Sequence, residues 1–78
     1  MDFNKLFLIC LDQEIGIEFF QEKCGFPHND PLLVKYTLRF SYRKKVIEYI
    51  EFSMERLMAV IESRIMEIVF NLKYSEDY

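Results

Sequence analysis

The sequence predicts an α+β fold in which a small antiparallel sheet, an N-terminal β-hairpin plus a third strand, packs on one long C-terminal amphipathic helix. Three observations support this prediction. Residues 32–43 alternate between apolar and polar side chains, apolar residues recur at helical spacing over residues 47–72, and a proline-bounded loop at residues 25–31 separates two arms. A chain of 78 residues has room for one domain, which we expect to span residues 1–78.

The first arm, residues 3–24, is expected to form the β-hairpin. Residues 3–11 are apolar on both sides, as in a strand that is covered on two faces. Residues 15–19 alternate, with Ile15, Ile17 and Phe19 on one side, and residues 12–13 would make the turn. An alternative is a helix over residues 13–24 that begins at an Asp12 cap and ends before Gly25, which gives a β-α-β-α order.

The third strand is the clearest element in the sequence. Over residues 32–43 an apolar and aromatic side alternates with a polar side. Period-two alternation with β-branched and aromatic residues is typical of a strand with one buried face. The apolar side comprises Val34, Tyr36, Leu38, Phe40 and Tyr42, and the polar side comprises Lys35, Thr37, Arg39, Ser41 and Arg43.

The C-terminal helix is expected to run from about residue 46 to residue 72, roughly 40 Å at ~1.5 Å per residue. Ile47 and Ile50 already lie on its apolar stripe, and the preceding basic run has no Gly or Asn for a tight turn. The alternative is a helix that starts after Ser53 as N-cap, with Glu55 in its first turn. Residues 46–52 would then be another strand, hairpinned to the one before.

Charge is distributed unevenly along the chain. Ten basic and 13 acidic residues give a net charge of −3, which argues against a general nucleic-acid binder. Residues 35–45 nevertheless carry five basic residues and no acid, between two arms that each sum to −4. This block could contact phosphates or an acidic partner, and its members are Lys35, Arg39, Arg43, Lys44 and Lys45.

Two interpretations of the basic block make different predictions. A nucleic-acid-binding module would use a basic row on one sheet face to follow phosphates. The other interpretation is cross-strand pairing of the same row with acidic neighbours. Whether Glu14 and Glu18 lie beside the row or on the opposite face distinguishes the two.

No metal site, cofactor or catalytic centre is expected. Cys10, Cys24 and His28, with Asp30 nearby, have the ligand types of zinc but not the spacing of a knuckle. Cys24 and His28 are also the one pair that could form a thiol nucleophile and its base. One His in the whole chain and no Gly-rich phosphate loop leave little for an enzyme, and no small-molecule substrate is predicted.

The apolar content exceeds what so small a domain can bury. Apolar residues make up 51% of the chain, with eight Phe and five Tyr. Apolar side chains also lie outside the stripe of the C-terminal helix, which indicates burial on a second side. We therefore expect a dimer or partner interface at Met54, Leu57, Met58, Ile61, Ile65, Met66, Ile68 and Phe70.

These features predict a small, non-enzymatic protein–protein interaction or regulatory protein. We expect it to be a homodimer that acts by occupying a surface of a larger target. Adaptors and inhibitors of the phage or mobile-element type act in this way. The composition, rich in Ile, Phe, Lys, Glu and Tyr with a single Ala, is typical of AT-rich genomes and suggests a viral or mobile-element origin. Two cysteines and no membrane-length apolar run favour the cytoplasm, which would be the host cytosol for a viral protein.

Overall fold

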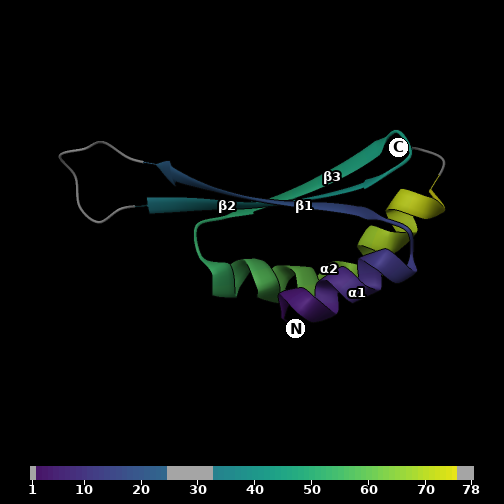
Figure 1. Ribbon diagram of the computed structural model, residues 1–78, viewed down its shortest axis with the longest axis horizontal. Coiled ribbons are helices and arrows are strands. Elements are labelled where there is room, and N and C mark those ends of the chain that lie inside the picture. The colour runs from purple at the N-terminus through teal and green to yellow at the C-terminus, as the bar shows by residue number, and fades with distance from the viewer. Residues whose placement is uncertain (1, 25–32, 76–78) are drawn as a thin grey trace.

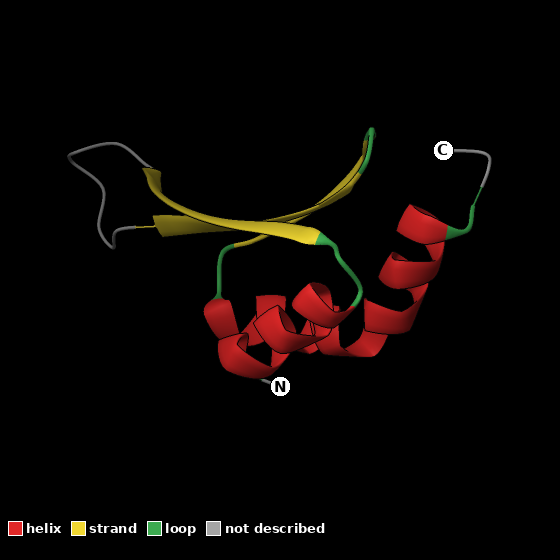
Figure 2. Ribbon diagram, turned by 45° about the vertical axis from the view of Figure 1, so that its right-hand side comes forward, coloured by secondary structure: helices red, strands yellow, loops and turns green. Residues whose placement is uncertain are grey.

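A computed structural model describes residues 2–24 and 33–75. The chain forms a flat two-layer structure with extents of 46 × 25 × 17 Å, in which both helices lie on the same face of the sheet (Figures 1 and 2). The strands pair antiparallel in the order β1-β2-β3. The predicted α+β class is confirmed, and the elements are α1 (Phe3–Asp12), β1 (Gly16–Cys24), β2 (Leu33–Tyr42), β3 (Lys45–Glu51) and α2 (Met54–Lys73).

The first element is a helix, so the strand predicted at residues 3–11 is wrong, as is the hairpin that included it. Asp2 caps α1 by accepting a hydrogen bond from the Lys5 backbone N–H at 2.8 Å. The helix buries Leu6 and Cys10, whereas apolar side chains on its other side remain exposed. A helix that is apolar all round has the same composition as a buried strand, which is why the sequence pattern misled.

The end of α1 is a Schellman motif. The Ile15 N–H donates to the Cys10 carbonyl at 2.8 Å, and the Glu14 N–H donates to the Leu11 carbonyl at 3.1 Å. Glu14 has a φ of 61°, the left-handed conformation that this position requires. Ile15 and Cys10 are both buried, so the motif also has its usual apolar contact. The alternative helix over residues 13–24 is wrong, because the chain continues as β1.

The strand predicted at residues 32–43 is confirmed as β2, the central strand. Leu38 and Phe40 face the helices and are fully buried, as their alternation predicted. On its two sides β2 pairs with β1, where Leu38 opposes Phe19, and with β3, where Leu38 opposes Tyr49. The loop predicted at residues 25–31 lies outside the described residues.

The long helix predicted from residue 46 begins eight residues later, so its favoured start is wrong and the Ser53 alternative is correct. The Ser53 Oγ accepts from the Arg56 N–H at 3.3 Å. Residues Lys45–Glu51 form β3 instead, with Ile47 facing the core layer and Ile50 about half exposed on the other face. The spacing of three between these isoleucines fits a helix stripe by coincidence.

A tight turn without Gly or Asn joins β2 to β3. Tyr42 pairs with Lys45, which leaves Arg43 and Lys44 as the two turn residues. Arg43 supplies the positive φ, 57°, that such hairpins need at their first turn position. The expectation that the Arg-Lys-Lys run cannot make this turn is therefore wrong, because an arginine adopts the conformation usually left to glycine.

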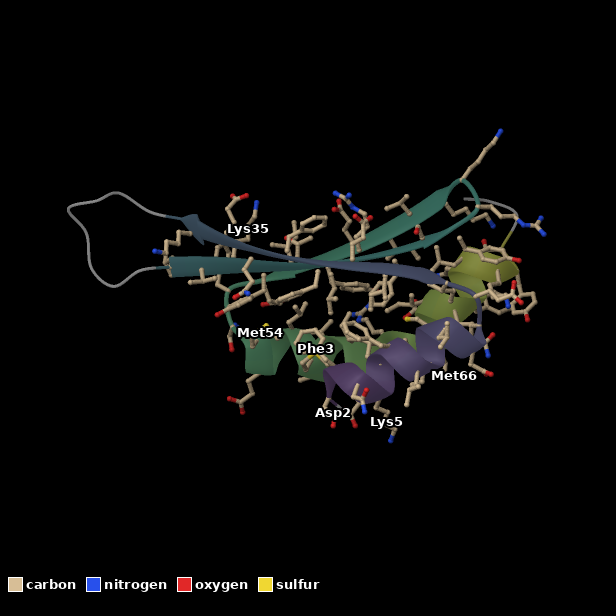
Figure 3. The ribbon with its side chains drawn as sticks, in the orientation of Figure 1. Asp2, Phe3, Lys5, Lys35, Met54 and Met66 are labelled. Carbon is tan, nitrogen blue, oxygen red and sulfur yellow. The ribbon has the colours of Figure 1, made fainter. Side chains whose placement is uncertain are left out.

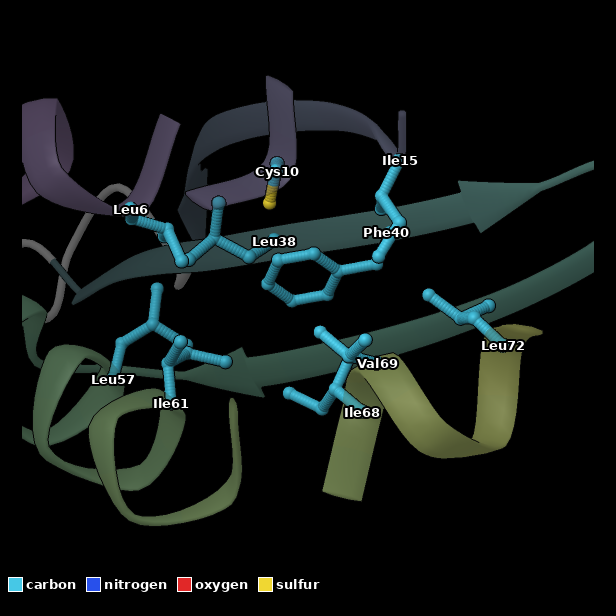
Figure 4. Packing of buried hydrophobic residues seen from close by; sticks show 10 residues of the cluster. All are labelled: Leu6, Cys10, Ile15, Leu38, Phe40, Leu57, Ile61, Ile68, Val69 and Leu72. Carbon is cyan, nitrogen blue, oxygen red and sulfur yellow. The ribbon is translucent and has the colours of Figure 1, made fainter. Parts of the chain in front are cut away.

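The core lies between the central strand and the two helices (Figure 4). Leu6 and Cys10 of α1 approach Leu38 from one side, and Leu57 and Ile61 of α2 approach it from the other. The second half of α2 rises toward the β2–β3 turn (Figure 2), and the Ser63 Oγ–Val60 carbonyl contact of 2.8 Å is of a kind that bends helices. The buried apolar residues are Leu6, Cys10, Ile15, Leu38, Phe40, Leu57, Ile61, Ile68, Val69 and Leu72.

Candidate functional site

The sheet face that the helices leave uncovered, here called the open face, carries two of the five residues of the basic block, Lys35 and Arg39. Arg39 of β2 stands between Glu18 of β1 and Glu48 of β3, which are its neighbours in the strand register. Its Nη2 lies 2.9 Å from Glu48 Oε2, and its Nη1 lies 3.8 Å from Glu18 Oε1. The guanidinium also lies 5.0 Å from the centroid of the Phe20 ring.

Lys35, four residues before Arg39 on the open face, also pairs with a glutamate of β1. It points away from the helices (Figure 3), and its Nζ lies 3.6 Å from Glu22 Oε1. Glu18 lies beside the basic row, opposite Arg39, whereas Glu14 lies in the connection between α1 and β1. Lys35 and Arg39 have the cross-strand acidic partners that the second interpretation expected, so their charges are largely neutralised.

The other three residues of the basic block belong to a different site, which we call the basic pocket. Here the β2–β3 turn meets the last turn of α2 around an open cavity of about 380 Å³. Within residues 2–24 and 33–75, no carboxylate lies within ion-pair distance of its four cations. The lining residues are Tyr42, Arg43, Lys44, Lys45, Leu72 and Lys73.

Lys73 is a member of this pocket that the sequence did not point to. It lies nearly thirty positions from the turn, and no spacing rule connects a helix end with a distant hairpin. Its position in the last turn of α2, where cations complement the helix dipole, is ordinary for a lysine. Only the rise of α2 toward the hairpin brings the two segments together.

The residues predicted as an interface on α2 fall into three groups. Leu57, Ile61 and Ile68 are at most 1% exposed and belong to the core of this chain. Met54, Met58 and Ile65 are partly buried against that core. Met66 and Phe70 remain exposed, at 79% and 58%.

The exposed apolar surface of the helical layer includes a contribution that the sequence analysis missed. Leu8 and Leu11 lie on the side of α1 away from its buried residues, with Phe7 at the edge of that side, and Leu11 is 75% exposed. Met66 and Phe70 lie on the side of α2 that faces away from the sheet, as the labelled Met66 shows (Figure 3). We call these five residues the outer stripes.

Cys10 is the one cysteine whose side chain the structure describes. No group of three or more His, Cys, Asp and Glu side chains gathers in the part of the chain that the structure describes. Cys10 is buried, and burial raises the pKa of its thiol from 9.0 to about 11. Cys24 is the last residue of β1, while His28 and Asp30 lie outside the described residues.

Within the described residues, neither helix has the length and apolarity needed to cross a membrane. Comparison with known proteins finds no family model, curated protein or solved structure that matches the chain. The functional interpretation consequently depends on the residues and geometry described above.

Proposed function

We propose that this chain is a small non-enzymatic interaction protein that forms a homodimer through the outer stripes and, as a dimer, occupies a surface of a larger target. The supporting observation is the exposure of Phe7, Leu8, Leu11, Met66 and Phe70 on one side of the helical layer. A large group of apolar side chains that is exposed on a protein surface commonly marks an interaction site.

A second copy is the occupant that these residues favour. The five side chains of the outer stripes are uncharged, so these side chains on two molecules can meet across a two-fold axis without repelling each other. Leu8, Leu11 and Met66 are long and flexible enough to interdigitate. The flat shape adds support, because a radius of gyration of 14.1 Å exceeds the about 11.5 Å of a compact chain of this length.

The proposed regulatory role assigns the target to other surfaces of the dimer, as for adaptors and inhibitors of viral or mobile-element type. It places the protein in a reducing cytoplasm, where a buried thiol such as Cys10 stays reduced. The alternative of a nucleic-acid module that reads phosphates with the open face has weaker support, because Glu18, Glu22 and Glu48 lie against its cations.

Light scattering on a sizing column, over a range of concentrations and at two salt levels, tests the proposal. We expect a dimer that persists at high salt, because apolar contacts are not screened. Leu11→Glu and Met66→Glu should each shift the mass to that of the monomer while the far-ultraviolet circular dichroism spectrum stays unchanged. Each substitution would place a charge inside the apolar contact.

Gln21→Glu is the matched control, since it introduces the same side chain at an exposed position on β1. This variant should remain dimeric. A wild-type chain that is monomeric at every concentration would refute the homodimer. Dissociation of all three variants alike would show that net charge, rather than the outer stripes, controls association.

A further inference from the structure

The basic pocket lies outside the surface proposed for the homodimer and has features of a ligand site. Arg43, Lys44, Lys45 and Lys73 bring four positive charges to one concave surface with no described carboxylate within ion-pair distance. Elsewhere on the sheet, Lys35 and Arg39 have acidic partners. Among the described residues, the basic run is therefore paired with carboxylates at Lys35 and Arg39 but not at Arg43, Lys44 and Lys45.

Neutral groups hold three of these four cations in place. The Lys45 ammonium donates to the Ser75 carbonyl, and the Lys73 ammonium donates to the Gln13 Oε1 at 3.5 Å. The Tyr42 ring lies beneath Arg43 and Lys73, at 5.3 and 5.4 Å from its centroid. These contacts orient the cations without cancelling their charge, which is the arrangement of a preorganised anion site.

Backbone geometry gives a second, independent indication. Arg43 occupies a turn position with a φ of 57°, where glycine is preferred and any other L-residue is strained. A glycine there would make a more stable hairpin. The arginine instead extends a guanidinium over Tyr42 at the rim of the pocket, 5.3 Å from the ring centroid.

We propose that the basic pocket binds a phosphate group. A phosphate presents close to two negative charges and several acceptor oxygens to the cations around one cavity, whereas a carboxylate presents one charge and two oxygens. Guanidinium and ammonium groups together suit this geometry. The cavity of about 380 Å³ is open to solvent and leaves room beside a phosphate group for the rest of a small phosphate compound or for the backbone of a nucleic acid.

Amide chemical-shift titration of the full-length, ¹⁵N-labelled protein with sodium pyrophosphate at an ionic strength of about 0.1 M tests the site. We expect saturable shifts at residues 42–45 and 73. Arg43→Gly and Lys73→Gln should each weaken binding at least about fivefold, the factor that corresponds to ~1 kcal/mol for one charge pair at 4 Å in water. Arg43→Gly should at the same time raise the melting temperature, so that weaker binding cannot be attributed to lost folding.

Lys23→Gln is the control, because it removes one positive charge from an exposed position on β1 outside the pocket. Its affinity should stay within about twofold of the wild type, since exposed charges beyond a Debye length of ~10 Å at 0.1 M salt are screened. Equal losses in the three variants, or shifts that never saturate, would overturn the proposal.

Two further ligands separate the possible sources of the phosphate. An oligonucleotide that binds at least tenfold more tightly than pyrophosphate, with the same dependence on Arg43 and Lys73, would assign the group to a nucleic acid. An oligonucleotide that binds no better than pyrophosphate would assign it to a small phosphate compound. Binding of polyglutamate without binding of pyrophosphate would replace the phosphate site by a site for acidic protein segments.

Discussion

Arg39 and Glu48 form a two-contact ion pair across the centre of the open face. The Arg39 Nε donates to Glu48 Oε2 at 3.0 Å, and Nη2 of the same guanidinium lies 2.9 Å from that oxygen. The two side chains are directly opposed in the register of β2 and β3, so the strand pairing itself holds them together.

A double-mutant cycle with Arg39→Gln and Glu48→Gln should give a coupling of about 0.5–1 kcal/mol, because both side chains are roughly 40% exposed and solvent screens them. The coupling should fall in 1 M salt. Urea unfolding of the four proteins measures it. The Arg64–Glu67 pair on α2, at 3.9 Å and more exposed, is the comparison and should couple by less than about 0.3 kcal/mol.

Ile61 and Met66 both lie on α2 and were both predicted to contact a partner, but their substitutions should have different effects on folding. Ile61→Ala should lower the free energy of unfolding by about 2–4 kcal/mol, because Ile61 is fully buried. Met66→Ala should change the free energy of unfolding of the monomer by less than about 0.5 kcal/mol, because the Met66 side chain is 79% exposed. Denaturant unfolding at low protein concentration separates these values from association, and equal losses would contradict the assignment.

Glu14→Gly should stabilise the chain by about 0.5–1 kcal/mol. The left-handed conformation of Glu14 costs a non-glycine residue ~1–2 kcal/mol, and the extra freedom of glycine in the unfolded chain offsets part of the gain. Thermal and urea unfolding measure the change. Glu14→Ala is the control and should give no gain, because alanine retains the strain.

The Cys10 thiol should react with iodoacetamide only as fast as the protein opens. With Cys24→Ser as background, labelling at pH 8.5 should be far slower than that of the unfolded chain, because the buried thiol has a pKa of about 11. The folded state holds this proton more tightly than the unfolded state, so the stabilisation is complete below about pH 9 and is lost as pH rises toward 11. Labelling as fast as that of the unfolded chain would contradict burial.

The sequence predicted the central strand and the α+β class because β2 is buried on one face only. The alternation of apolar and polar residues along β2 is therefore visible in the local sequence, and it predicts the burial of Leu38 and Phe40. The Ser53 cap was also visible, but Ile47 and Ile50 imitated a helical stripe. The local sequence cannot distinguish a chance spacing of this kind from the apolar stripe of a helix, because the pairing of β3 with β2 determines the structure of this segment.

The first helix and the basic pocket lay beyond the local pattern for different reasons. α1 exposes Leu8 and Leu11 to solvent, so its apolar residues do not mark a single buried face. The pocket depends on the approach of Lys73 to the β2–β3 turn, which is a tertiary contact. The Asp2 cap of α1 was the one local signal that could have indicated the helix.

The share of the core contributed by α2 has a consequence for the order of folding during synthesis. Five of the ten buried apolar residues, from Leu57 to Leu72, belong to this last of the five elements. The three strands and α1 leave the ribosome earlier, when five of the eight other buried side chains of the core are still to be made. Until α2 emerges, the apolar face of the nascent sheet is only partly covered, and transiently exposed apolar surface of this kind is prone to aggregation.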